Sequence, residues 1–306
     1  MATFADMVTD LHILTMGRLS DDLLKLFLNR AQSQECENYD WSFLHTNYVL
    51  NTVPQRTEGT ITVSRGSNLV SGTGAAFSQA DVGAFLWIGG LNIPPVPIQS
   101  VQGANTVTLQ FAWSGPTVVN TGYVVAPLYY LIEGSLEIKS IRQQVDLVKV
   151  TQEDLNGIDP MRIAQGGDPS LNWAPAPASP DGSLQVELWP VPSQYAPYLV
   201  SYKMRAPVMV YDNDTPVIPY QCLEYLALNA CFMALYSSTG SAANADLAQK
   251  YNDLYTASHE EAQVADRRRL AAKNQVTAGT PQQGWVWLRE LGTTDFGSIG
   301  GGAGGS

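Results

Sequence analysis

The stretch PYQCLEYLALNACFMALY, residues 219–236, decides how this chain folds. Pro219 suits the first turn of a helix, where its missing N–H group costs nothing. The strongly polar residues that follow are only Gln221, Glu224 and Asn229. A helix that is apolar on nearly all sides must be surrounded by protein. The stretch therefore predicts a buried helix that begins directly after the proline.

A strand and a second helix are expected on either side of the buried helix. Residues Tyr198 to Met204 are rich in Tyr, Leu and Val, which favours a strand. Residues Ala242 to Lys273 predict a helix roughly 45 Å long, since each residue of a helix adds 1.5 Å. One face of it would carry Leu247, Tyr251, Leu254, Ala262 and Ala265, with charges on the rest. The second half of the chain thus predicts a strand followed by a helical hairpin.

The first 57 residues predict two more helices and an aromatic segment. Apolar residues recur at near-helical spacing from Thr3 to Met16, and Ser20-Asp-Asp starts a clearer helix that runs to about Asn38. Tyr39-Asp-Trp-Ser-Phe-Leu then places three large aromatic residues just beyond the helix. We expect these rings to pack the helices against the rest of the core.

The pattern changes to short alternating runs between Glu58 and Ala126, separated by glycine-containing turns. Six such runs in about seventy residues predict a small antiparallel sandwich or barrel, inserted between helical parts of the chain. The expected fold class is α+β, with a helical-bundle core, a long C-terminal helical hairpin and this inserted β domain. The expected units are residues 1–57 (N-terminal helices of the core), 58–127 (β domain), 128–279 (core strands and helical hairpin) and 280–306 (a C-terminal docking tail).

The composition indicates a protein that does not grip nucleic acid. The 306 residues are 45% hydrophobic and 15% charged, and the formal net charge is −11. Binding to phosphates requires a basic surface that releases counterions, which this balance does not provide. It does not exclude a protein through which DNA passes.

The cysteines and the N-terminus indicate a protein made in a reducing cytoplasm. Cys36, Cys222 and Cys231 have no metal-ligand spacing. Two of them lie nine residues apart on the predicted buried helix, about 13.5 Å apart and beyond disulfide reach. The N-terminus lacks the basic and apolar regions of a signal peptide, and no apolar run is long enough to span a membrane.

No catalytic motif stands out, so we expect no enzyme activity, cofactor or metal. The chain contains no H-E-x-x-H, G-x-S-x-G or P-loop sequence. His259-Glu-Glu lies on the polar side of the long helix and is interpreted as solvated. Asp21-Asp22 fits a helix start, and Asp212 with Asp214 fits a turn. Arg267-Arg-Arg fits a helix C-terminus, or else a contact with an acidic partner surface or a phosphate.

The order of these features resembles the head-to-tail adaptor (connector) proteins of tailed bacteriophages. The resemblance rests on the two N-terminal helices, the aromatic segment, the β insertion that opens with Gly59-Thr-Ile-Thr-Val-Ser-Arg-Gly-Ser, and Trp189-Pro-Val-Pro before a Tyr-rich strand. Pro219 before a buried helix completes it. It covers about Thr3 to Lys273, and the last thirty or so residues do not match the family's pattern.

The resemblance implies a structural virion protein, made in the bacterial host cytoplasm. Such a protein assembles, usually as twelve copies, into a ring beneath the portal protein. The ring extends the DNA channel without binding DNA specifically, and it receives the tail or nozzle proteins. Small residues on the long helix, Ala262 and Ala265 among them, would allow close approach between copies.

Interface residues are expected at three places. Ala262 and Ala265 would lie between copies, Arg267, Arg268 and Arg269 would meet a partner, and Trp285 and Trp287 in the C-terminal segment would anchor to another ring component, most plausibly the portal. Two other function classes stay open. A carbohydrate-binding or receptor-binding virion module would need Trp87 and Trp113 exposed on a platform, and a hydrolase would need a cleft with carboxyl pairs of raised pKa.

Overall fold

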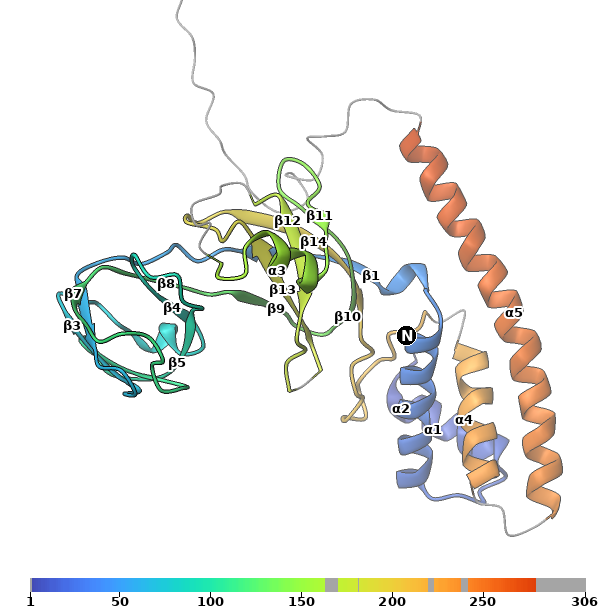
Figure 1. Cartoon of the computed structure of the whole chain (residues 1–306). Helices are drawn as coiled ribbons and strands as arrows, with labels where there is room; N and C mark the ends of the chain where they lie inside the picture. Colours follow the sequence, from blue (N-terminus) through green and yellow to red (C-terminus); the bar gives the residue numbers. More distant parts are fainter. Residues whose placement is uncertain (1, 163–169, 181, 220–222, 238–241, 279–306) are drawn as a thin grey trace, which may run out of the picture.

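The computed structural model describes residues 2–162, 170–180, 182–219, 223–237 and 242–278. Within these ranges the backbone forms three β-sheets and a cluster of helices. Figure 1 shows them side by side, with a seven-stranded sheet at one end, two smaller sheets in the middle and the long helices at the other end.

The seven-stranded sheet has the order β7-β2-β3-β6-β5-β4-β8, and all of its neighbouring strands are antiparallel. Its interior is one hydrophobic cluster that includes Ile61, Val70 and Trp113. Short strands of alternating burial, such as the iBiB pattern of β2, explain why the sheet has one apolar face. The strands are β2 (Thr60–Val63), β3 (Leu69–Thr73), β4 (Phe85–Ile88), β5 (Val96–Gly103), β6 (Thr106–Leu109), β7 (Val118–Thr121) and β8 (Tyr123–Ala126).

Two further sheets pack on each other in the middle of the molecule. The first has the order β1-β14-β10, and the second has the order β11-β12-β13-β9. A single hydrophobic cluster with Ile132, Trp173 and Tyr198 draws residues from both. The strands are β1 (His45–Asn51), β9 (Tyr129–Ile132), β10 (Ser135–Arg142), β11 (Val148–Lys149), β12 (Asn172–Ala176), β13 (Leu184–Trp189) and β14 (Pro197–Met204).

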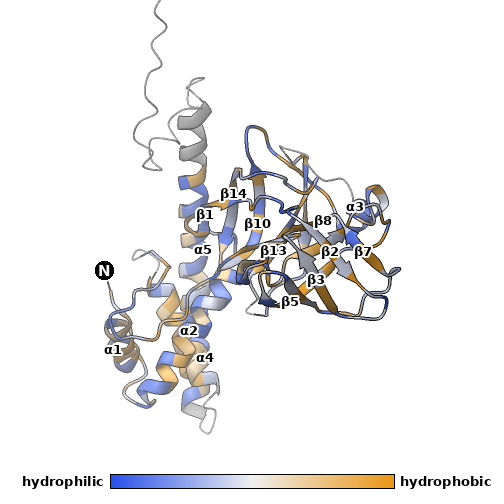
Figure 2. Ribbon diagram, turned by 90° about the vertical axis from the view of Figure 1, so that its left-hand side faces the viewer, coloured by the Kyte–Doolittle hydropathy of each residue, from blue (hydrophilic) through white to orange (hydrophobic). Residues whose placement is uncertain are grey.

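The helices form the third unit, with α4 in contact with α1, α2 and α5. A hydrophobic cluster with Leu11, Leu28 and Leu226 joins them, and Figure 2 shows apolar residues along α1, α2 and α4. The helices are α1 (Phe4–Leu14), α2 (Asp21–Asn38), α4 (Leu223–Ser237) and α5 (Ala242–Ala278), while the short α3 (Gln152–Ile158) lies beside β12. The two short 3₁₀ turns are η1 (Ser42–Leu44) and η2 (Gln79–Asp81).

The expected fold class, a helical-bundle core with a small β insertion, is wrong. Three sheets of seven, four and three strands make the described chain rich in β structure. Residues 128–204, expected as strands that support a helical core, instead build most of the two middle sheets, which share a hydrophobic cluster of their own. The helices are one unit beside these sheets and do not form a core around which the rest is arranged.

Individual elements were predicted more accurately than their assembly. The expected helices over Thr3–Met16 and from Ser20 to Asn38 correspond to α1 and α2, and the expected strand Tyr198–Met204 corresponds to β14. The long helix begins at the expected Ala242 and extends to Ala278. Among the α-helices and strands, four were missed, namely β1, β7, α3 and β12.

The seven-stranded sheet joins the middle sheets through a narrow neck. Arg56 and Val125 form an antiparallel bridge, so the chain enters and leaves this sheet at adjacent positions. The Arg56 guanidinium also forms an ion pair with the buried Asp81. A small hydrophobic cluster that includes Trp87, Leu128 and Val191 fills the contact between the two parts.

Candidate functional site

The candidate site lies where η1 meets α4 and α5. Asp266 of α5 is 6% exposed, and its carboxylate accepts hydrogen bonds from the Ser42 backbone N–H at 3.0 Å and from the Ser42 hydroxyl at 2.5 Å. A buried carboxylate is stabilised when donors of this kind satisfy it. These two bonds therefore hold the segment after α2 against the middle of α5.

Three aromatic rings stack directly beside this contact. Trp41 is fully buried, and its ring stacks on Phe43 at 5.5 Å between centroids and on Tyr225 at 5.7 Å. The stack connects the segment after α2 to α4, since Tyr225 belongs to α4. These rings were expected to pack the N-terminal helices against the rest of the core, and the structure places Trp41 against Tyr225 of α4 and His259 of α5.

A buried carboxylate from α2 joins α4 and α5 on the inner side of this stack. Glu35 is 2% exposed, and its Oε1 accepts hydrogen bonds from Asn229 Nδ2 at 3.1 Å and from the Tyr255 hydroxyl at 2.5 Å. Its Oε2 lies 2.9 Å from His259 Nε2, within ion-pair distance but at an angle unsuited to a hydrogen bond. Burial, together with the hydrogen bond to Glu35, raises the pKa of the Tyr255 hydroxyl.

The interpretation of His259 as a solvated residue is wrong. Its side chain is 18% exposed and packs edge-on against Trp41 and Tyr225, with ring centroids at 5.6 Å and 5.5 Å. The two residues that follow it, Glu260 and Glu261, are exposed as expected. The histidine thus lies on the inner face of α5, where it faces Glu35.

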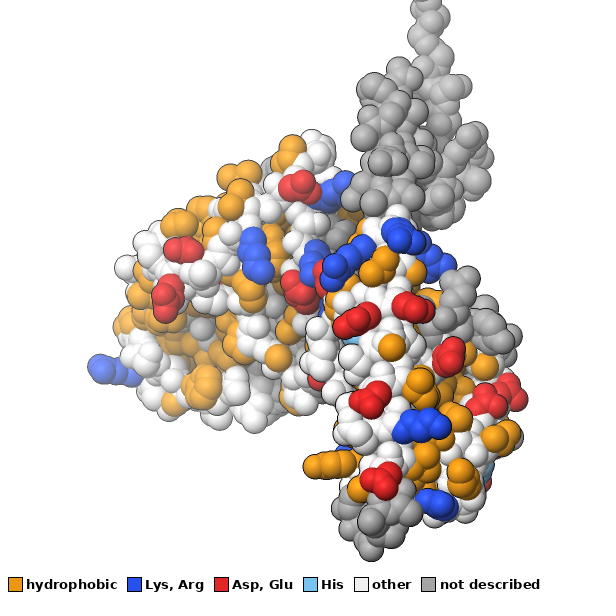
Figure 3. Space-filling view, turned by 90° about the vertical axis from the view of Figure 1, so that its right-hand side faces the viewer, with side chains coloured by type: hydrophobic (Ala, Val, Ile, Leu, Met, Phe, Trp, Pro, Cys, Tyr) orange, Lys and Arg blue, Asp and Glu red, His pale blue; other side chains and the backbone are white. Residues whose placement is uncertain are grey.

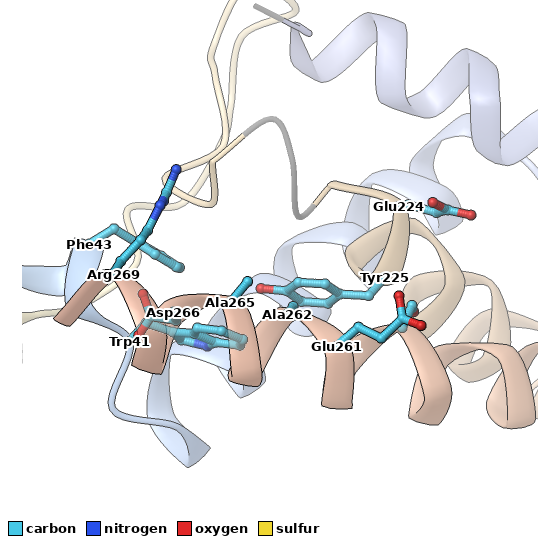
Figure 4. Close-up of a pocket in the computed structure, with 10 residues that line it drawn as sticks. Trp41, Phe43, Glu224, Tyr225, Glu261, Ala262, Ala265, Asp266 and Arg269 are labelled. Carbon is cyan, nitrogen blue, oxygen red and sulfur yellow. The ribbon is translucent and has the colours of Figure 1, made fainter. Parts of the chain in front are cut away.

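A groove of about 300 Å³ opens above the aromatic stack (Figure 4). Figure 4 shows Glu224 and Glu261 at one end of the groove and Arg269 at the other, with Ala262 and Ala265 along the wall that α5 provides. Opposite charges at its two ends favour a polar or dipolar partner surface over a purely apolar one.

The predicted interface residues of α5 divide between the inside and the outside of the helical unit. Ala262 is half-buried and packs against the hydrophobic cluster of the helices, whereas Ala265 is exposed. The guanidinium of Arg267 donates to the Tyr39 hydroxyl at 3.3 Å, Arg268 is exposed, and Arg269 lines the groove. Trp285 and Trp287 lie outside the described residues.

The three arginines do not lie at the helix C-terminus. α5 continues to Ala278, so Arg269 precedes the last turn, and the field of the helix end does not account for the cluster. Figure 3 shows Lys and Arg side chains gathered on the upper part of this face of the described chain, above a surface of acidic and apolar side chains. A partner contact is the interpretation that this arrangement leaves open.

The described residues contain no group of three or more His, Cys, Asp or Glu side chains that could hold a metal ion. The pKa of the carboxyl group is lowered at Asp6, Asp21, Asp40, Asp154 and Asp214. At Asp6, Asp154 and Asp214 the main cause is hydrogen bonds from backbone N–H groups, as is typical of helix starts and turns.

Within the described ranges, no helix combines the length and apolar character that a membrane crossing requires.

Sequence reasoning missed Glu35, although the sequence contains a signal for it. The apolar stripe of α2 runs through Leu24, Leu28 and Ala31, and Glu35 is the next position on the same face. A carboxylate on the apolar face of a helix is almost never buried without a partner. Asn229 gives the matching signal in α4, since it is a polar residue inside a nearly continuous apolar run.

No family model matches this chain, and no curated protein shows significant similarity to it.

Proposed function

We propose that this protein is a structural component of a tailed-bacteriophage virion, a head-to-tail adaptor. Copies of it would form a ring below the portal protein, extend the DNA channel and attach the tail. It would work without a cofactor or catalytic residue, and DNA would pass through its lumen without specific binding.

The observation that carries the proposal is the excess length of α5. The helix has 37 residues and is about 55 Å long, whereas its partner α4 has 15 residues. α5 therefore runs past the end of α4, as Figures 1 and 2 both show. A long, polar helix that its own chain covers on one side is suited to contacts with other chains.

Two further features support the proposal. The order of the elements along the chain is the one that resembles the adaptor family, including the aromatic segment and the β unit between helical parts. The net charge of −11 suits a channel wall that must not hold DNA phosphates. The helical-bundle core implied by the resemblance gives no support, because the chain is rich in β-sheet.

The alternative of a carbohydrate-binding or receptor-binding module depended on exposed rings of Trp87 and Trp113, and both rings are buried. Trp87 and Trp113 are 5% and 2% exposed, and the Trp113 indole N–H donates to the Pro116 carbonyl at 2.7 Å. Both rings are packed inside the protein and form no exposed platform for a sugar.

A mass measurement on the purified protein tests the proposal. Twelve copies of a 33.2 kDa chain weigh about 400 kDa, and electron micrographs of such an assembly should show a ring with a central hole. The protein should be measured alone and with a portal protein, so that a ring that forms only on the portal is also detected. A protein that stays monomeric at high concentration and does not bind the portal is not an adaptor.

The proposal assigns the C-terminal segment, residues 280–306, to the contact with the portal through Trp285 and Trp287. A chain truncated after Gly279 should still form the ring but should no longer join the portal. Unchanged portal binding by the truncated chain would remove this assignment and leave the ring itself in place.

A further inference from the structure

α5 carries a second apolar stripe on its outer side. Leu254 and Val264 are 46% and 45% exposed, and Ala257 between them is also exposed. Successive members of the stripe are separated by three or four residues, so they share one face of the helix. The complete outer stripe is Lys250, Leu254, Ala257, Glu261, Val264 and Arg268.

The outer stripe differs from the face that packs on the chain's own helices. That inner face contains Ala248 and Tyr251, both buried. Lys250 and Arg268, toward the two ends of the stripe, are exposed and form no ion pair with any described residue. The stripe is thus an apolar line with a cation near each end and one carboxylate, Glu261, at its middle.

The same unit contains a groove between α1 and α4, which we call the α1–α4 groove. It measures about 560 Å³, and one of its walls is Ile13, whose side chain is 71% exposed. Its other lining residues include the apolar Leu14, Leu223 and Ala227 and the acidic Asp10 and Glu224. Both carboxylates are exposed and have no ion-pair partner in the described part of the chain.

We propose that the outer stripe of one copy packs into the α1–α4 groove of the next copy. The inference rests on the proposed ring and identifies the surfaces that build it. The apolar residues of the stripe would be removed from water by packing against the apolar floor of the groove. Lys250 and Arg268 would approach Asp10 and Glu224. A helix that lays an apolar face into a groove is a recurrent recognition mode.

The occupant of the groove must come from another copy. α5 already packs on α4 through its inner face, so its outer stripe cannot enter the α1–α4 groove of its own chain. An interface between two different surfaces of the same protein is heterologous, and it produces a closed ring or an open filament according to its rotation. This is the kind of contact that a ring of identical adaptor subunits requires.

Paired cysteine variants test the contact in the full-length chain. One variant carries Leu254→Cys and the other Ile13→Cys, both with Cys222→Ser, because Cys36 and Cys231 are buried. Under mild oxidation, a mixture of the two should give disulfide-linked dimers, while neither variant alone should do so. A Val119→Cys variant, exposed on β7, is the matched control and should not cross-link to Ile13→Cys.

The outcomes separate this inference from the proposed function. Cross-linking of the Leu254→Cys variant with itself would mean that α5 meets α5, which overturns the inference. A ring that forms without any cross-link in the mixture leaves the adaptor proposal standing and also overturns the inference. A protein that is monomeric under all conditions, with and without the portal, overturns both.

Charge reversal gives an independent test of the same contact. The double variant Lys250→Glu, Arg268→Glu should need a protein concentration at least about tenfold higher than the wild type to assemble. The double variant Asp10→Lys, Glu224→Lys should show the same change. A chain that carries all four substitutions should regain most of the wild-type assembly, since each new cation again faces a carboxylate. If the variant with all four substitutions assembled even less well than either double variant, the proposed pairing of charges would be contradicted.

Discussion

Glu35 shows how one buried carboxylate connects three helices. It lies on α2, accepts a hydrogen bond from Asn229 of α4, and faces Tyr255 and His259 of α5. Removing one partner of a buried hydrogen bond destabilises a protein by more than the bond contributes to stability. The remaining donors stay buried with neither a hydrogen-bond partner nor water to replace it. The free energy that holds α5 on the other helices therefore depends on this side chain.

We expect Glu35→Ala to lower the free energy of unfolding of the helical unit by about 3 kcal/mol. Urea denaturation followed by far-ultraviolet circular dichroism measures this. Glu37→Ala is the matched control, since Glu37 lies on the same helix but is exposed and should change stability by less than about 0.5 kcal/mol. Equal effects of the two substitutions would mean that the Glu35 contacts contribute little.

The two described cysteines lead to a prediction about reactivity. Burial raises the pKa of the Cys36 and Cys231 thiols to about 12, so about one in ten thousand is ionised at pH 8. The thiolate is the reactive form, so both residues should resist alkylation by iodoacetamide in the folded protein and react after denaturation. Peptide mass mapping distinguishes them from Cys222. Rapid alkylation of either thiol in the native protein would contradict its burial.

At the scale of elements, α5 is a helix with two different sides. Ala262 contacts the hydrophobic cluster of the helices, whereas Ala265 is exposed three residues further along. The sequence placed both alanines on one face together with Leu254, because helical spacing alone does not tell which part of a wide stripe is covered. The burial of each residue depends on where α4 and the aromatic segment lie.

This difference makes Ala262 and Ala265 a matched pair. Ala262→Leu should lower the free energy of unfolding by about 1 to 3 kcal/mol, since an enlarged side chain must push into a packed contact. Ala265→Leu should leave unfolding nearly unchanged, since its side chain has room at the exposed edge of the groove. Thermal denaturation of both variants measures the difference. A stable Ala262→Leu variant would place this alanine outside the packed interior.

Some elements could be predicted from the sequence and others could not, for physical reasons. α4 was predictable because its apolar residues leave no polar side. β1 was not, because only Leu50 of its seven residues is buried and its pattern does not alternate. β1 exists because it pairs along its whole length with β14, about 150 residues later in the chain. Such pairing leaves no local signal.

At the scale of the whole molecule, the arrangement of the sheets could not be predicted. The sequence indicated most strands between residues 128 and 204, but not that they form two sheets around a shared hydrophobic cluster. Sheet order depends on contacts between residues far apart, whereas helices are determined largely by nearby residues. The candidate site was predictable in part. The aromatic segment was visible in the sequence, but its contacts with Glu35, Asp266 and His259 were not.

The neck at Arg56 and Val125 leads to a prediction for the seven-stranded sheet. Because the two residues are bridged, a short linker can replace residues 58–126 without moving the chain on either side. We expect this deletion to retain the helical signal in circular dichroism. It should also reduce solubility, because Leu128 and Val191 lose the cover that Trp87 provides. A variant that loses its helical signal would show that the helices depend on this sheet.

The spacing of the outer stripe has a geometric consequence for any assembly built on it. Its members repeat every seven residues, as in Lys250, Ala257 and Val264, whereas two turns of an α-helix take 7.2 residues. The stripe therefore drifts around α5 by about 40° over two repeats. A neighbour that follows it must lean across α5 at an angle. When copies tilt in the same sense around an axis, the channel that they enclose is narrower at its middle than at its two ends.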